Sequence, residues 1–184
     1  MPRADAQRNI DALLEAAKEE FLANGVDVSV RAIAGRAGVG TATLYRHFPL
    51  RSDLISAVFR REIDDCLAAA SQLAATHDPD KALELWLQRY TKFVAAKHGL
   101  GAALNMSDPT YRALPVYFHE HLGPALQMLL SNAEAAGTVR GGVDALDLLG
   151  AVANLCIPPP GSHDNSRAQR MVALLIDGLR YQPA

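Results

Sequence analysis

Residues 29–51 read SVRAIAGRAGVGTATLYRHFPLR, and they contain two short helical patterns. Ser29 can cap the first helix, which is expected over residues 30–37 and stops at Gly38. The second helix ends before Pro49, because the residue that precedes a proline is pushed out of the helical region. Two short helices separated by a few residues around a glycine predict a helix-turn-helix.

Helical patterns also fill the rest of the chain. Before the helix-turn-helix, apolar residues recur at every third or fourth position until Asn24-Gly25 ends the helix. After it, a long helix is expected over residues 51–72, and a strand pattern is confined to residues 26–30. We therefore predict an all-α fold of about nine helices. Beyond residue 72 the expected helices cover 81–98, 101–106, 109–121, 125–136, 144–156 and 165–180, with a kink or restart at Gly123-Pro124.

Positive charge is concentrated in the helix-turn-helix. The whole chain has a formal net charge of −2, yet residues 29–51 hold four arginines and no acidic residue. Residues 61–184, by contrast, hold ten Lys or Arg against thirteen Asp or Glu. A local cationic surface on a mildly acidic protein is typical of a small module that contacts phosphates.

Composition excludes several other classes of protein. Apolar residues make up 49% of the chain, but no run approaches the roughly 20 apolar residues that cross a bilayer. The polar N-terminal residues show no signal-peptide pattern, so no membrane association and a cytoplasmic location are expected. The two cysteines, Cys66 and Cys156, are expected to be buried free thiols rather than a disulfide or metal site.

The segment over residues 30–49 resembles the helix-turn-helix of the TetR/AcrR family of transcriptional regulators. The marks of this resemblance are Ala37-Gly38-Val39, Leu44-Tyr45-Arg46-His47-Phe48, Arg51-Ser52-Asp53-Leu54 and the first-helix residues Leu13-Leu14, Phe21 and Gly25. The resemblance covers roughly residues 8–65. The region from Trp86 to Leu104 and the apolar last helix are similar to the subgroup with an SbtR-like C-terminal domain.

The resemblance implies a DNA-binding regulator, by default a repressor, with two domains. A helix-turn-helix domain is expected over residues 1–50, and an all-helical ligand-binding and dimerisation domain over residues 51–184. The long helix over residues 51–72 connects them.

The second helix of the motif is expected to read DNA. Small residues at its start allow close approach to base edges in the major groove. Arg46 is the best candidate for bidentate contact with a guanine. The resemblance implies phosphate contacts by Arg31, Tyr45, His47 and Arg51. Many members of the family carry Ser or a bulkier polar residue where Gly40 and Ala42 stand. The bases that this helix prefers therefore cannot be inferred from the resemblance. The predicted DNA-contacting residues are Arg31, Thr41, Ala42, Thr43, Tyr45, Arg46, His47 and Arg51.

A homodimer is expected to form through the helices over residues 144–156 and 166–180. Both are apolar enough to need a partner. A symmetric dimer would place two heads about 34–36 Å apart, one turn of DNA, and would require a palindromic operator.

A small-molecule effector is implied by the resemblance, and it would act by favouring a head separation that does not fit DNA. Its pocket is expected among aromatic and thioether side chains, although such a stripe is also typical of a plain core. The predicted ligand-contacting residues are Trp86, Tyr90, Phe93, Leu104, Met106, Tyr117, Phe118 and His121.

Two alternative functions remain open. A metal- or redox-responsive regulator would use His119, His121, Cys66 or Cys156, but their spacings do not converge on a known site. A small helical enzyme is suggested only by His119-Glu120-His121, whose histidines are two positions apart rather than the four of a zinc protease helix. We therefore predict no catalytic residue, no metal and no cofactor.

Overall fold

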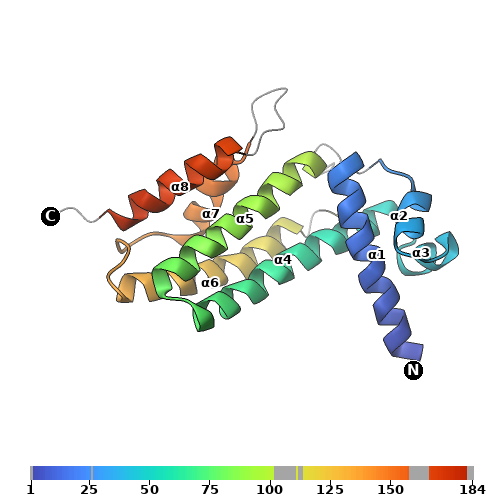
Figure 1. The fold of residues 1–184 in the computed structure, drawn as a ribbon, viewed down its shortest axis with the longest axis horizontal. Coiled ribbons are helices and arrows are strands. Elements are labelled where there is room, and N and C mark those ends of the chain that lie inside the picture. Colours follow the sequence, from blue (N-terminus) through green and yellow to red (C-terminus); the bar gives the residue numbers. More distant parts are fainter. Residues whose placement is uncertain (1, 26, 102–110, 112–113, 158–165, 182–184) are drawn as a thin grey trace. The chain divides into compact units, whose positions relative to one another are not determined.

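The computed structural model describes residues 2–25, 27–101, 111, 114–157 and 166–181 (Figure 1). These residues form eight α-helices and no strand, which confirms the predicted all-α class. None of these helices is long and apolar enough to span a membrane. The helices are α1 (Pro2–Asn24), α2 (Val30–Arg36), α3 (Thr41–His47), α4 (Arg51–Thr76), α5 (Pro79–Gly101), α6 (Leu114–Ala135), α7 (Ala145–Leu155) and α8 (Ser166–Arg180).

The chain divides into two compact units. The first comprises residues 1–61 and 99–115, and the second comprises residues 62–98 and 116–184. Helix α4 therefore begins in the first unit and ends in the second.

Local signals set the helix boundaries in the first unit, as the sequence predicts. Helix α1 ends where Gly25, at φ +78°, donates its amide to the Phe21 carbonyl at 3.0 Å. The Ser29 hydroxyl caps α2 by accepting from the Ala32 amide at 3.2 Å. Gly38, at φ +69°, makes the turn to α3, a conformation that costs a residue with a Cβ about 1–2 kcal/mol.

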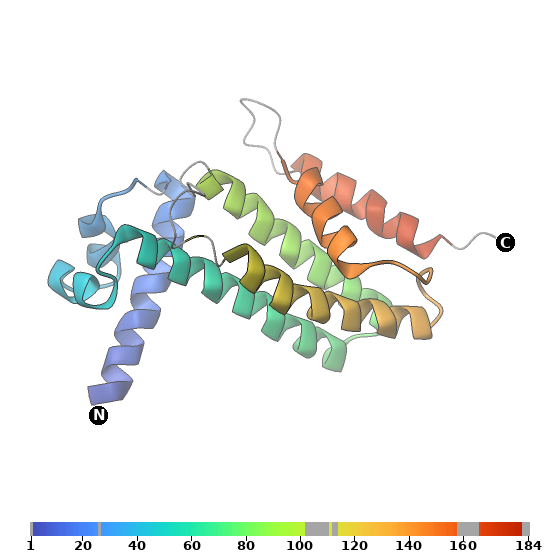
Figure 2. The ribbon, with the colours of Figure 1, turned by 180° about the vertical axis from the view of Figure 1, so that it is seen from behind.

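The second unit has a core built on α5. Trp86, Leu87 and Tyr90 are fully buried. Indole Nε1 of Trp86 donates to the Cys66 carbonyl of α4 at 2.8 Å, and the Tyr90 hydroxyl donates to the Leu149 carbonyl of α7 at 3.2 Å. Figures 1 and 2 show the second half of α4, α5 and α6 as long neighbouring rods, with α8 alongside α5.

Two of the expected helix boundaries are wrong. Of the kink or restart expected at Gly123-Pro124, the restart is wrong, because helix α6 continues through both residues although Pro124 cannot donate an amide hydrogen bond. Buried Leu122 and Leu126 hold both sides of this point in the core. Helix α5 also passes Gly99 and ends at Gly101, since a glycine inside a helix costs only about 1 kcal/mol. Of the short helix expected over residues 101–106, only Gly101 is described, and it ends α5. The rest of that helix and the start expected at Pro109 lie outside the described residues.

Candidate functional site

Helix α3 has one face in the core and one face in water. Leu44 is buried and Phe48 is 8% exposed, and these two side chains fix the helix against the first unit. Thr41, Ala42 and Arg46 are exposed, and the Tyr45 side chain is 53% exposed. Four of the side chains of α3 that are predicted to contact DNA are therefore exposed to solvent.

Four more residues are predicted to contact DNA. Arg31 on α2 is exposed, and the other three are half-buried. Thr43 and His47 are half-buried, and the His47 ring lies 6.5 Å from the Phe48 ring between centroids. Arg51 is half-buried, and its Nη2 donates to the Val28 carbonyl just before α2. Arg51 therefore ties the start of α4 to the start of the helix-turn-helix.

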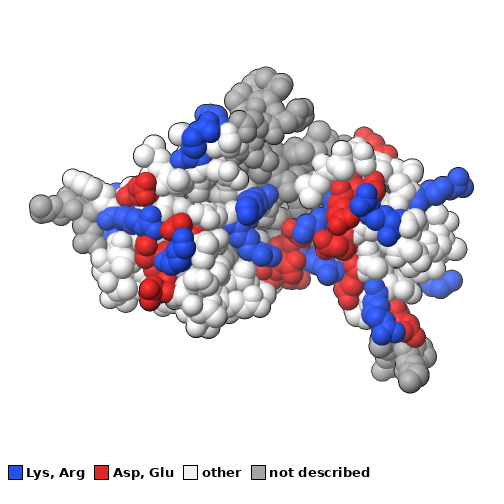
Figure 3. Space-filling view, in the orientation of Figure 1, with Lys and Arg blue, Asp and Glu red and all other residues white. Residues whose placement is uncertain are grey.

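The charge of Arg36 is paired with two carboxylates, although its side chain is 46% exposed. Its Nε donates to Glu20 Oε1 at 2.6 Å and its Nη1 to Glu19 Oε2 at 2.7 Å, so α2 is bound to α1. Arg36, with help from Asn24, holds the pKa of the Glu20 carboxyl below its usual value. In Figure 3 acidic side chains gather over α1, whereas basic side chains project at the edge formed by α2 and α3.

The expected effector-binding residues form two separate groups. Trp86, Tyr90 and Phe93 are buried, and the Phe118 ring lies 6.0 Å from that of Tyr90 and 6.4 Å from that of Phe93. The Trp86 and Tyr90 rings stack at 5.7 Å, and burial raises the pKa of the Tyr90 hydroxyl. The polar atoms of Trp86 and Tyr90 already bind backbone carbonyls, and the four rings pack together as an aromatic cluster in which Phe118 is half-buried.

The second group is half-buried. Tyr117 and His121 stack with their ring centroids 3.9 Å apart, and the Tyr117 hydroxyl donates to Asp64 Oδ1 on α4 at 2.6 Å. Nδ1 of His121 donates to the Tyr117 carbonyl at 2.8 Å. Leu104 and Met106 lie outside the described residues.

A cleft between α5 and α8 was not expected from the sequence. It encloses about 300 Å³ and is lined by Gln88, Thr91, Lys92, Gln169, Val172, Ala173 and Ile176. None of these residues belongs to the aromatic set singled out above. The available signal was the spacing of four residues between Gln88 and Lys92 and between Val172 and Ile176, which places each pair on one helix face.

Helices α7 and α8 each leave large apolar side chains in water. Leu146 at the start of α7 and Ile157 just beyond its end are about half exposed, and Leu174 on α8 is 65% exposed. Exposed apolar side chains on adjacent helices are typical of an interface with another chain.

Both cysteines are buried free thiols, as predicted. Burial raises the pKa of the Cys66 thiol to about 11 and also raises the pKa of the Cys156 thiol, whose Sγ lies 3.9 Å from the Thr91 carbonyl. Within the described part of the chain, no three His, Cys, Asp or Glu side chains gather in a way that could hold a metal ion.

Two family models match most of the chain. The one described as bacterial regulatory proteins, tetR family, matches residues 13–58. The one described as transcriptional regulator SbtR-like, C-terminal domain, matches residues 78–181, which is more than half of the chain.

Solved structures of full length agree with these models. TetR transcriptional regulator SCO0520 from Streptomyces coelicolor is 31% identical with a TM-score of 0.79, and the match covers 95% of this chain and 99% of that one. The TetR transcription regulatory protein from Mycobacterium vanbaalenii is 32% identical with a TM-score of 0.74, covering 98% of this chain and 100% of that one.

A curated relative matches about a third of the chain. HTH-type transcriptional regulator SAUSA300_2515 of Staphylococcus aureus (strain USA300) is 41% identical over 63 residues, which are 34% of this chain and 34% of the relative. The match therefore spans about a third of the length of that curated protein. Taken with the two family models and the solved structures, it identifies the chain as a member of the TetR family of transcriptional regulators, with an SbtR-like C-terminal domain.

Proposed function

We propose that this chain is a cytoplasmic transcriptional repressor, rather than an enzyme, that binds a palindromic DNA operator as a homodimer and leaves it when a small molecule binds. The observation that carries the proposal is the division of α3 into two faces. Leu44 and Phe48 anchor the helix, while Thr41, Tyr45 and Arg46 face solvent. A helix held in this way can place its exposed face in the major groove while its buried face stays packed against the core.

The exposed side chains of the head suit two kinds of DNA contact. Arg46 can form a bidentate pair with the O6 and N7 atoms of a guanine, which is worth about 1–3 kcal/mol of discrimination. Thr41 and Ala42 are small enough to let the start of α3 approach base edges. Arg31, Thr43, Tyr45, His47 and Arg51 are proposed to bind phosphates, which positions the helix without reading sequence.

Dimerisation is proposed to use α7 and α8. Leu146, Ile157 and Leu174 present apolar area that a second copy would bury. One head alone makes too few phosphate contacts for specific binding at physiological salt, so the second head is required for function. A two-fold axis through this interface would require an operator with two inverted half-sites.

The experiment that tests the proposal is selection of DNA from a random duplex library with the purified chain. We expect an inverted repeat whose half-site centres lie about 10 base pairs, or a multiple of this, apart. Binding of the selected duplex is then measured by fluorescence anisotropy at several salt concentrations. Selection that returns no repeat, or affinity that does not change with sequence, contradicts the proposal.

A further inference from the structure

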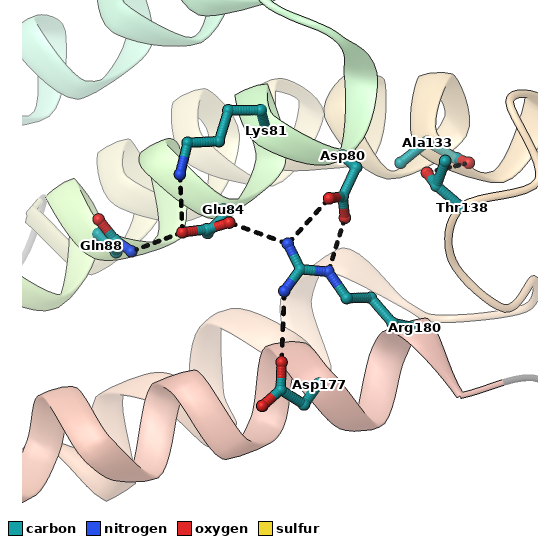
Figure 4. A network of polar contacts seen from close by, with 8 residues as sticks. All are labelled: Asp80, Lys81, Glu84, Gln88, Ala133, Thr138, Asp177 and Arg180. Atoms are coloured by element: carbon teal, nitrogen blue, oxygen red, sulfur yellow. Dashed lines mark hydrogen bonds and ion pairs between the residues drawn. The ribbon is translucent and has the colours of Figure 1, made fainter.

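An ion-pair network joins the start of α5 to the end of α8 (Figure 4). Nε and Nη2 of Arg180 on α8 each donate to the Asp80 carboxylate on α5 at 2.9 Å. The same Nη2 also donates to Glu84 Oε2 at 2.9 Å, and Lys81 Nζ lies 3.0 Å from Glu84 Oε1. Nη1 of Arg180 lies 3.3 Å from Asp177 Oδ1 on its own helix, so each of the three carboxylates is paired with a cation. None of these three carboxylates lines the cleft, which begins one helical turn further along α5, at Gln88.

The cleft has an apolar floor and a polar wall. Val172 and Ile176 on α8 are buried and form the floor together with Ala173. The wall carries the side chains of Gln88 and Lys92. Thr91 also lines the cleft, but its hydroxyl already donates to the Leu87 carbonyl at 2.7 Å.

Lys92 is the one charged residue among the described residues that line the cleft. Among the residues that the structure describes, Lys92 makes no ion pair and no acidic side chain lines the cleft. The amide nitrogen of Gln88 donates to Glu84 at 3.0 Å, which leaves its carbonyl oxygen to accept from elsewhere. The Gln169 side chain, across the cleft on α8, has no hydrogen-bond partner among the described residues.

We propose that this cleft binds a small monocarboxylate with an apolar body, and that Lys92 pairs with its carboxylate while the body lies on Val172 and Ile176. A single lysine matches one negative charge, whereas a phosphate dianion would keep a charge unmatched beside an apolar floor. The volume is at the small end of ligand pockets, which are about 300–1,000 Å³. This inference rests on the proposed function, because it gives the effector a site and a chemical class.

The test titrates the full-length chain, without DNA, with hexanoate and benzoate and with the matched neutral hexanamide and benzamide. Isothermal titration calorimetry gives the affinities, and amide NMR shifts locate the site. We expect saturable binding of the acids, at least about tenfold tighter than the amides, since hydrogen bonds to charged groups contribute that much. The largest shifts are expected at Lys92, Gln169 and Ala173.

Variants separate the cleft from other sites. Lys92→Met is expected to lower acid affinity to that of the amide, whereas Arg89→Met removes an exposed cation of the same helix that does not line the cleft, and leaves binding unchanged. Ala173→Trp fills the cleft from an exposed position and abolishes binding of both ligands. Ala135→Trp, at an exposed position on α6, is the matched control.

Three results overturn the inference. These are equal affinity for acid and amide, tighter binding of inorganic phosphate than of either acid, and no saturation by either acid below ~10 mM. An affinity weaker than this would not indicate a specific binding site. A negative titration would leave the regulator proposal standing, because DNA selection is independent of it. A chain that bound hexanoate in this cleft but selected no operator would instead contradict the proposed function.

Discussion

The guanidinium of Arg36 lies between two carboxylates of α1, 2.6 Å from Glu20 and 2.7 Å from Glu19. Glu20 is buried, so this contact joins α2 to α1 at the edge of the core. Four arginines stand in residues 29–51, but the charge of one of them, Arg36, is already paired with two carboxylates of the same protein. The positive charge available to DNA is therefore smaller than the sequence indicates.

Arg36 and Arg31 are expected to differ in their effect on the salt dependence of DNA binding. Arg31→Met removes an exposed cation, so the slope of log affinity against log salt should fall by about 1 for each head. Arg36→Met should leave that slope unchanged and lower the melting temperature. Anisotropy titrations at several salt concentrations and thermal melts followed by circular dichroism measure both. An equal change of slope in the two variants contradicts the assignment.

Arg46 and Tyr45 are expected to have different roles in operator binding. Arg46→Ala should relax the preference at one position of each half-site, at a cost of about 1–3 kcal/mol. Tyr45→Phe removes only a hydroxyl and should weaken all sequences about equally, because a phosphate contact carries no sequence information. Repeating the DNA selection with each variant distinguishes the two. If Tyr45→Phe changed the consensus, the division of roles would be wrong.

Gly38 and Gly35 provide a test of the helix-turn-helix backbone. Gly38→Ala forces a Cβ onto a residue at φ +69° and should destabilise the chain by about 1–2 kcal/mol. Gly35→Ala lies inside α2 with no atom within 4 Å of the added Cβ, and should stabilise it by about 0.5–1 kcal/mol. Urea unfolding followed by far-ultraviolet circular dichroism measures both. Destabilisation by both substitutions would count against the turn as described.

Leu174 is expected to be required for dimerisation. Leu174→Arg places a charge in the proposed apolar interface, twice by symmetry, and should weaken the dimer at least about a hundredfold. Leu22→Arg is the control, because Leu22 is a similarly exposed leucine on α1. Analytical ultracentrifugation over a concentration series gives the dissociation constants. A stable dimer of the Leu174 variant would exclude α8 from the interface.

The network around Arg180 is expected to contribute to stability at neutral pH and to lose its contribution in acid. Arg180, followed by Lys81, holds the pKa of Glu84 below its usual value. The contribution is therefore fully present above the ordinary carboxyl pKa of about 4.3 and is lost as pH falls through the lowered value.

Arg180→Met should accordingly lower stability by about 1 kcal/mol at pH 7, since the groups are partly exposed. The stabilities of variant and wild type should converge as the pH falls through the lowered pKa of Glu84. Arg170→Met, whose guanidinium contacts only Ser166 among the interactions described, is the control. A difference in urea midpoint that stays constant from neutral to acid pH contradicts this account.

The helix-turn-helix could be predicted from the sequence because its signals are local. Ser29 caps a helix through a residue three positions away, and Gly38 determines a turn through its own backbone. The assignment of Arg36 could not be made in this way, because its partner Glu20 is 16 positions earlier on another helix.

The second unit was harder to predict because its glycines and prolines act through packing. Gly123-Pro124 has the composition of a helix break, yet a Cβ at position 123 would lie 2.9 Å from Leu146 Cδ2. The glycine therefore makes room for a neighbouring helix rather than ending its own. The cleft depends in the same way on which faces of α5 and α8 meet, and periodicity within each helix does not contain that information.

Trp86 is the single tryptophan of the chain, and it is fully buried with its indole nitrogen bound to the Cys66 carbonyl. Tryptophan fluorescence consequently reports unfolding of residues 62–98 and 116–184, and it does not report unfolding of the DNA-reading head. If the head unfolded independently, the tryptophan fluorescence would not change. Comparison of an emission curve with a backbone signal on the same sample would therefore reveal whether the two units unfold together or in sequence.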